Sequence, residues 1–236
     1  MNTPRVPIAK LSTGELKLDR EVSHYVSRVL RLSHGDRFVA FDPEARCEAA
    51  ATLLLVAKEN VTVSVAPLEP ATLVPERAVT IIQCVGKGSK LSAVVRDASE
   101  LSATLVLPAV SKYSVAERGS AAAHARLARI AVEAARQCGR GDVLRVEASA
   151  SLGDILGRFS SGRRVALHPT GAPLRDALVS LGRKEPVVLL IGPEGGLAPE
   201  ELALASDLGF MIASLGPLVL RTETAAAAAL GALLVV

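Results

Sequence analysis

From residue 78 onward, short apolar runs alternate with longer segments of helical periodicity, and this alternation limits the possible folds more than any other feature. The runs 163–169 and 186–192 are apolar almost throughout, as in strands of a parallel sheet that helices cover on both faces. Segments 90–101 and 121–138 carry apolar residues three and four positions apart, which is typical of helices packed on such a sheet. We therefore predict an α/β domain over residues 73–236.

Residues 1–72 follow a different pattern. Helical spacing over residues 18–32 begins at Asp19, a good N-cap, and the turn 34–36 is expected to end this helix. Runs of strand length and composition follow it. One helix and several short strands predict a small β-barrel, with the domain boundary in the proline-containing segment 68–77.

Composition excludes several classes of protein. The formal net charge is only +3, so a nucleic-acid site would have to be a local patch. The three cysteines lie far apart, which excludes a disulfide framework and a cysteine zinc site and suggests a reducing cytoplasm. The four histidines are scattered, so we expect no metal site. The longest apolar run, 225–236, is too short to cross a bilayer, and no signal peptide is apparent, so we expect no membrane partner.

Three predicted strands end in proline and glycine. The sequences "ALHPTG", "LIGPEGG" and "SLGPLVLRTET" each leave an apolar run in this way. Glycine allows close approach of the backbone to a ligand, and proline fixes φ. Ligands of open α/β sheets bind outside the carboxyl ends of the strands, so we predict that these three loops form one crevice.

Each motif also has a purely structural interpretation. "IGPEGG" alone could be a tight turn, with Glu194 favouring the positive N-terminus of the helix near Pro199. Thr222 could be the N-cap of the last helix. Arg28 and Arg31, one helical turn apart, could be solvated, and His168 could bond the backbone of its own loop. Dinucleotide and triphosphate fingerprints are missing, and "GKGSK" has the wrong spacing for a phosphate loop.

The combination of motifs closely resembles a known family. "LIGPEGGLAPEE" followed by "SLGPLVLRTETAAAAAL" is similar to the 16S rRNA uridine-N3 methyltransferases, RsmE, of the knotted SPOUT superfamily. "HYVSRVLRLSHGDRFVAFD", "GKGSKLSAVVRDASEL" and "RIAVEAARQCGR" extend the resemblance over nearly the whole chain. Three departures are Leu218, where the family usually has arginine, Ser102, where it has glycine, and "SKYSVAERG", which replaces the usual "ERS" segment and makes Ser114 its equivalent.

The resemblance implies a fold, a cofactor and a reaction. Residues 1–72 would be a PUA-like barrel that binds RNA, and residues 73–236 a SPOUT domain with a deep trefoil knot. S-adenosylmethionine (SAM) would donate a methyl group to N3 of a uridine in 16S rRNA near the decoding site of the small ribosomal subunit. Arg221, whose charge is permanent, would stabilise the uridine anion, with Glu223 a further catalytic candidate. Glu194 would brace its loop or face the reacting end.

The resemblance also implies a set of binding residues. The residues expected to hold SAM are Leu167, Ile191, Gly192, Glu194, Gly195, Gly196, Leu215, Gly216, Pro217, Leu218 and Leu220. The residues expected to contact RNA are Arg5, Arg28, Arg31, Lys87 and Lys90.

The sequence of the last predicted helix indicates the oligomeric state. Residues 222–236 are apolar almost all round, and such a helix has to be buried on most sides. SPOUT relatives dimerise through helices of the knot region, so the resemblance points to a homodimer as well.

Two other functional classes stay open. A non-catalytic RNA-binding protein with a degenerate methyltransferase domain would fail to transfer methyl groups to ribosomal subunits. An α/β enzyme acting on a small molecule would fail to bind SAM in calorimetry.

Overall fold

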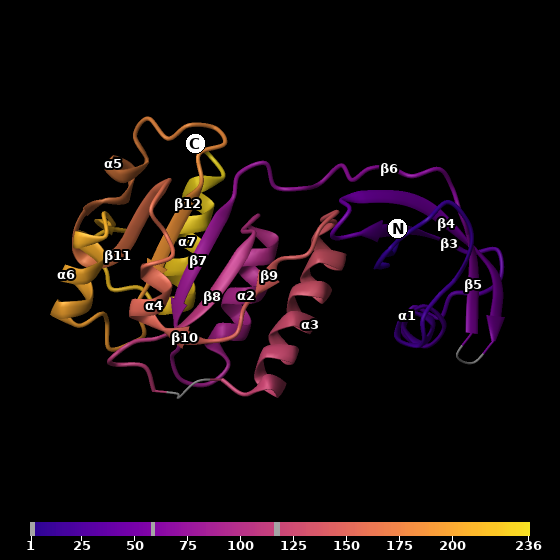
Figure 1. The fold of residues 1–236 in the computed structure, drawn as a ribbon, viewed down its shortest axis with the longest axis horizontal. Coiled ribbons are helices and arrows are strands. Elements are labelled where there is room, and N and C mark those ends of the chain that lie inside the picture. The colour runs from indigo at the N-terminus through magenta and orange to yellow at the C-terminus, as the bar shows by residue number, and fades with distance from the viewer. Residues whose placement is uncertain (1–2, 58–59, 116–118) are drawn as a thin grey trace. The chain divides into compact units, whose positions relative to one another are not determined.

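The computed structural model describes residues 3–57, 60–115 and 119–236, and Figure 1 shows the order of their elements. The chain forms two compact units. The first comprises Met1–Val74 together with Ala135–Val143, and the second comprises Pro75–Ala134 together with Leu144–Val236. Each unit has its own sheet.

The first unit contains a mainly antiparallel sheet around a small apolar core. Its hydrogen-bonded order is β1-β3-β4-β5-β2, with β6 paired to β4, and only β1 and β3 run parallel. Inward-facing residues alternate along β5, as expected for a sheet with one buried face. The strands are β1 (Arg5–Pro7), β2 (Gly14–Lys17), β3 (Arg37–Asp42), β4 (Cys47–Ala57), β5 (Asn60–Val65) and β6 (Glu69–Pro70).

The helix of this unit is shorter than expected. Asp19 is its N-cap, and its carboxylate accepts a hydrogen bond from Val22 N–H at 2.8 Å. The helix consists of α1 (Arg20–His24) and the π-helical turn η1 (Tyr25–Val29). It ends there because Arg31 adopts a left-handed φ of 56°. The prediction that this helix continues to residue 32 is therefore wrong, and Arg28 and Arg31 are not one regular helical turn apart.

The second unit contains a parallel sheet, which confirms the predicted α/β class. The order is β10-β8-β7-β12-β11-β13, with β9 paired to β8. Strands β7 and β12 are buried along their whole length, as their continuous apolar sequences predict. The strands are β7 (Val79–Cys84), β8 (Leu105–Val110), β9 (Arg145–Val146), β10 (Ala150–Ser151), β11 (Arg163–Pro173), β12 (Val187–Ile191) and β13 (Met211–Ser214).

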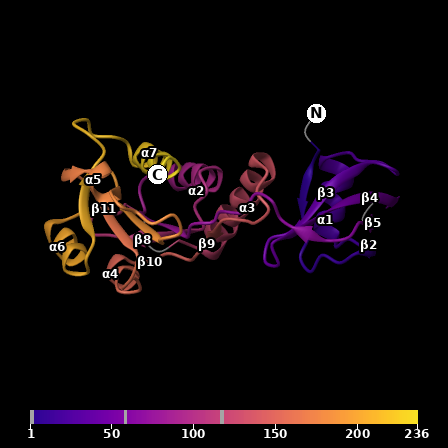
Figure 2. The same cartoon turned by 90° about the horizontal axis from the view of Figure 1, so that it is seen from above.

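Helices cover both faces of this sheet. Helices α2 and α7 lie against each other on one face, and α4 lies on the other (Figure 2). Leu152, Ile155 and Leu156 of α4 join a buried cluster that includes Ile82 and Leu190 from the central strands. The helices are α2 (Lys90–Glu100), α3 (Ala121–Cys138), α4 (Leu152–Leu156), α5 (Leu174–Leu178), α6 (Pro199–Asp207) and α7 (Thr222–Leu233). In the described part of the chain, none of the helices has the length and apolarity needed to span a membrane.

Two segments depart from regular backbone geometry, one in β11 and one after α2. In β11 the register with β13 shifts, so that Leu167 and Ala172 both pair with Ala213 and residues 168–171 bulge out between them. After α2, Ser102 adopts a left-handed φ of 64°, at the position where the family resemblance expects glycine.

Candidate functional site

Three parallel strands end side by side where the predicted ligand loops begin. Leu167 of β11 lies opposite Ile191 of β12 on one side and opposite Ala213 of β13 on the other. Because the strands are parallel, the segments after them leave the sheet at the same edge. This arrangement gathers the bulge 168–171, the loop 192–198 and the loop 215–221.

A cavity of about 290 Å³ lies among these segments. It is near the lower end of the range for small-molecule sites, about 300–1,000 Å³. Two glycines border it with backbone in the left-handed region, Gly196 with φ 76° and Gly216 with φ 132°. A Cβ atom placed at either glycine would meet nothing within 4 Å, so open space lies directly against the backbone. The wall can therefore cradle a ligand through main-chain groups.

The cavity wall contains most of the predicted cofactor residues. Every predicted cofactor residue except Pro217 is among the described residues that line the cavity. Leu218, where the family resemblance expects arginine, lines the cavity with 77% of its surface exposed. The lining residues are Leu167, His168, Pro169, Ile191, Gly192, Pro193, Glu194, Gly195, Gly196, Leu197, Ser214, Leu215, Gly216, Leu218, Val219, Leu220, Thr222 and Ala225.

A buried hydrogen-bond relay fixes the start of α7 against the loop 192–198. Gln83 Nε2 donates to Thr222 Oγ1 at 2.8 Å, and Thr222 Oγ1 donates to the carbonyl oxygen of Gly192 at 2.9 Å. Thr222 is therefore not the N-cap of this helix, a position that Arg221 occupies. Sequence reasoning missed Gln83, although a polar amide side chain in the largely apolar strand β7 was a usable signal.

Glu194 joins two loops that are distant in sequence. Its Oε1 lies 2.5 Å from Lys90 Nζ and accepts a hydrogen bond from the Lys87 N–H at 3.2 Å. The hydrogen bond from Lys90 holds the pKa of Glu194 below its ordinary value. The carboxylate also packs over Gly86, where a Cβ atom would lie 2.5 Å from Oε2. The described partners of Glu194 are thus in the segment 86–90. The acidic residues in the first turn of α6 are Glu200 and Glu201, and Glu201 accepts a hydrogen bond from Ala198 N–H.

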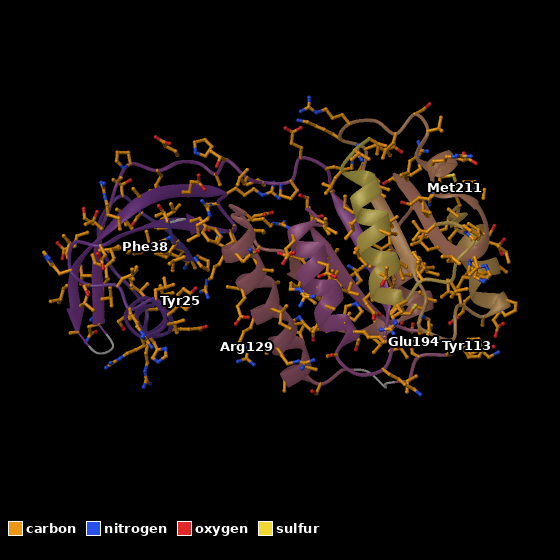
Figure 3. The ribbon with its side chains drawn as sticks, turned by 180° about the vertical axis from the view of Figure 1, so that it is seen from behind. Tyr25, Phe38, Tyr113, Arg129, Glu194 and Met211 are labelled. Carbon is orange, nitrogen blue, oxygen red and sulfur yellow. The ribbon has the colours of Figure 1, made fainter. Side chains whose placement is uncertain are left out.

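Gly195 is restricted by a protein side chain. A Cβ atom at Gly195 would lie 3.0 Å from the Cβ of Tyr113, and Figure 3 shows Tyr113 and Glu194 in the same region. Glu201 fixes the segment before Tyr113, because its carboxylate accepts a hydrogen bond from Lys112 N–H at 2.7 Å. A side chain at Gly195 would therefore be in tight contact with Tyr113 unless Tyr113 shifts.

The two catalytic candidates lie at the start of α7. Arg221 is exposed and occupies the N-cap without a side-chain cap hydrogen bond. A cation at the positive end of a helix opposes the helix dipole, so stability does not explain an arginine here. Glu223 is half-buried, and within the described residues its Oε2 is a buried oxygen with no hydrogen-bond partner. Neither residue belongs to the described wall of the cavity.

The RNA candidates fall into different environments. Arg5 is mostly buried, pairs with Glu48 at 2.6 Å and lies over the Phe41 ring, so its guanidinium is committed within the first unit. Arg28 and Arg31 are exposed on the same unit.

In the second unit, Lys87 is exposed, whereas Lys90 is engaged with Glu194. His168 Nδ1 lies 2.8 Å from Thr170 Oγ1, as expected for a residue that bonds its own loop.

Comparisons with known proteins agree with this geometry. The family model of an RNA methyltransferase domain matches residues 74–234. The chain is 31% identical over 227 residues to a ribosomal RNA small subunit methyltransferase E of Mycobacterium bovis, covering 91% of this chain and 84% of that protein.

Solved structures share the fold. A methyltransferase of Legionella pneumophila, solved with bound SAM, superposes with a TM-score of 0.90 at 28% identity, covering 100% of this chain and 98% of that one. A ribosomal RNA small subunit methyltransferase E of Neisseria gonorrhoeae, bound to SAM, gives a TM-score of 0.91 at 24% identity, covering 99% and 98%.

Proposed function

The chain belongs to the family of ribosomal RNA small subunit methyltransferases E, and from this premise we propose that it transfers a methyl group from SAM to N3 of a uridine in 16S rRNA. The observation that carries the proposal is the cavity of about 290 Å³ at the ends of β11, β12 and β13. Its wall is made of the loops whose sequences characterise the family.

The cavity has the features that a SAM site needs. Open space against Gly196 and Gly216 leaves main-chain groups accessible to the adenosine part of the cofactor. Leu167, Ile191 and Leu220 supply apolar surface for the adenine. When bound, SAM supplies a methyl group activated by a positively charged sulfur.

The reaction requires a free Watson–Crick edge. N3 of uridine carries a proton and lies on the pairing edge, so the base has to be unpaired or extruded. The N3–methyl bond forms as the sulfur–methyl bond breaks, the bonding pair stays on sulfur, and the N3 proton passes to a base and from there to water. We assign to Arg221 the stabilisation of negative charge on the uridine, because its charge is permanent and its position at the α7 N-cap has no structural explanation. Glu223, with its buried unpartnered oxygen, is the second catalytic candidate.

The domain assignment follows the same premise. We propose that residues 1–72 form a PUA-like RNA-binding barrel and that residues 73–236 form a SPOUT domain with a trefoil knot. Arg28 and Arg31, both exposed, are the candidates for phosphate contacts on the barrel. Mechanical unfolding of single molecules tests the knot, because a tightened knot leaves the stretched chain shorter than its full contour length.

We further propose that the protein works as a homodimer in the cytoplasm. Val219 and Val235 are each 83% exposed, and Val235 lines an apolar groove that also includes Leu178 and Val179. A second copy of the chain would cover such surface. Light scattering at micromolar concentration should give twice the 24.5 kDa chain mass, and a fully active species at the monomer mass would contradict the dimer.

Methyl transfer itself is tested on ribosomal RNA. Nucleosides of 16S rRNA from a strain that lacks this protein should lack one 3-methyluridine, as measured by mass spectrometry. Adding the purified protein and SAM to small subunits from that strain should restore it. An unchanged nucleoside profile, or restoration of a methyl group at a different atom, would overturn the proposed reaction.

A further inference from the structure

A second cavity lies beside the first in the same compact unit. Its volume is about 360 Å³, and no described residue lines both cavities. The loop 85–91, the first turns of α3 and the segment 147–149 form its walls. The function proposed above does not use this cavity.

The second cavity combines an apolar interior with a cationic rim. Val85, Pro108 and Leu127 contribute apolar surface, and Lys87 and Arg126 contribute exposed positive charges. Apolar walls can contact the face of a nucleobase, and exposed cations can contact phosphate.

Among the described residues of this wall, the acidic one, Glu147, does not cancel this charge. Glu147 is paired with Arg145 at 2.6 Å and with Arg158 at 2.9 Å. The hydrogen bond from Arg158 keeps the pKa of Glu147 below its ordinary value, so the carboxylate stays ionised and neutralised by these partners. The cationic rim is therefore left to attract an anionic ligand.

The partition between the cavities limits what the second one can hold. Gly86 lines the second cavity and Glu194 lines the first, and these two residues are in direct contact. The Lys90–Glu194 ion pair reinforces this wall. This contact separates a base in the second cavity from the first cavity, so we take it to be a different base from the one that is methylated.

We propose that the second cavity binds a nucleotide of the substrate RNA that flanks the methylated one. Its base would lie against the apolar walls and its phosphate at Lys87 and Arg126. By holding a neighbouring nucleotide, the cavity positions the strand so that the target base reaches the cofactor cavity. This inference rests on the proposed function for its substrate, but RNA binding to the cavity can be measured without catalysis.

Three variants separate a pocket from a diffuse charged surface. Arg126→Met removes one rim charge, and Ala123→Trp fills the cavity without changing charge, because Ala123 lines it on α3. Arg129→Met is the matched control, since Arg129 is exposed on the same helix (Figure 3) but is not in the described wall. The readouts are the Kd for a fluorescein-labelled fragment of 16S rRNA by anisotropy, kcat and KM with small ribosomal subunits, and the Kd for SAM by calorimetry.

Arg126→Met and Ala123→Trp should each raise the RNA Kd and KM at least fivefold, with kcat and SAM affinity within twofold of wild type. Arg126→Met should also lower the slope of log Kd against log salt by about one, whereas Ala123→Trp should leave the slope unchanged. Arg129→Met should change each constant by less than twofold. Equal effects of Arg126→Met and Arg129→Met, or an unchanged RNA Kd in a folded Ala123→Trp protein, would contradict RNA binding in the second cavity.

The proposed function can fail separately. Wild-type protein that binds RNA and SAM without transferring a methyl group would contradict the proposed function, whereas the inference about the second cavity would still be decided by the RNA Kd of the variants.

Discussion

Glu194 Oε1 lies 2.5 Å from Lys90 Nζ, and this contact ties the loop after β12 to the loop before α2. The two side chains are about one-third exposed, so the pair is neither fully solvated nor buried. The pair lies between the two cavities and holds the loop after β12, which lines the first cavity, in place.

The ion pair predicts a pH-dependent contribution to stability. The pKa of Glu194 is lower in the folded protein than its ordinary value of 4.5. Its contribution is therefore present above the unfolded-state pKa and is lost as pH falls through the folded-state pKa. Lys90→Met should lower the melting temperature by roughly 1–4 °C at pH 7, and the difference from wild type should shrink as the pH falls below 4.5. A difference that persists undiminished at pH 3 would show that Lys90 acts through packing alone.

The Thr222 hydroxyl should be required for both stability and cofactor affinity. Thr222→Val keeps the shape of the side chain but removes the group that accepts from Gln83 and donates to Gly192. Leaving buried polar groups unpaired should lower the free energy of unfolding by about 1–3 kcal/mol in urea denaturation. SAM affinity should fall as well, since the relay positions the cavity wall. Thr222→Ser retains the hydroxyl and should lose less of both; a larger loss in Thr222→Ser than in Thr222→Val would assign the effect to the methyl group.

Gly195 and Tyr113 should be energetically coupled. Gly195→Ala brings a Cβ atom to 3.0 Å from the Cβ of Tyr113, so the variant should lose roughly 1–3 kcal/mol of unfolding free energy. Tyr113→Gly removes the opposing atom and should relieve most of this loss in the double mutant. Tyr113→Ala keeps the Cβ and should not relieve it. Additive effects of Gly195→Ala and Tyr113→Gly would mean that the two sites do not interact.

Arg221 should contribute to the chemical step more than to cofactor binding. Arg221→Ala should lower kcat for methyl transfer about 100-fold, as expected when one charge that stabilises a transition state is removed. The SAM Kd should change by less than about threefold. The fold should not suffer, because Arg221 is exposed and makes no cap hydrogen bond. Parallel losses in kcat and SAM affinity would reassign Arg221 to cofactor binding.

Ser102 stores backbone strain that glycine would remove. Its left-handed φ of 64° carries a steric cost for any residue with a Cβ atom. Ser102→Gly should raise the free energy of unfolding by about 0.5–1 kcal/mol, because relief of strain exceeds the added flexibility of the unfolded chain. Ser102→Ala keeps the Cβ and should give no gain. Both variants can be compared by urea denaturation.

The sequence predicted the elements of the second unit well where the signal was local. The apolar runs 163–169 and 186–192 became β11 and β12, and the periodic segment 121–138 became α3 with both ends as expected. Short elements such as β9, β10, α4 and α5 were not anticipated, because two to five residues carry no periodicity and take their conformation from tertiary packing.

The candidate site was predicted only in part, because local sequence signals identify loops but not the distant side chains that meet in them. Glycine and proline after a strand mark a loop at a known edge of a sheet, so the segments around the cavity could be named. The pairs Gln83–Thr222 and Lys90–Glu194 could not, because no local pattern specifies which distant side chains meet. The end of the helix before Arg31 could not be predicted either. It depends on the left-handed backbone of Arg31, and residues other than glycine rarely adopt this conformation.

The relay from Gln83 to Thr222 also bears on how the protein is made. These side chains are 139 positions apart, and closing a loop of that length costs about 4 kcal/mol of chain entropy. During synthesis the strand β7 appears long before α7, so the nascent chain has Gln83 in place while its partner is still missing. The cofactor cavity therefore cannot close on a partly synthesised chain, and its completion belongs to the last stage of folding.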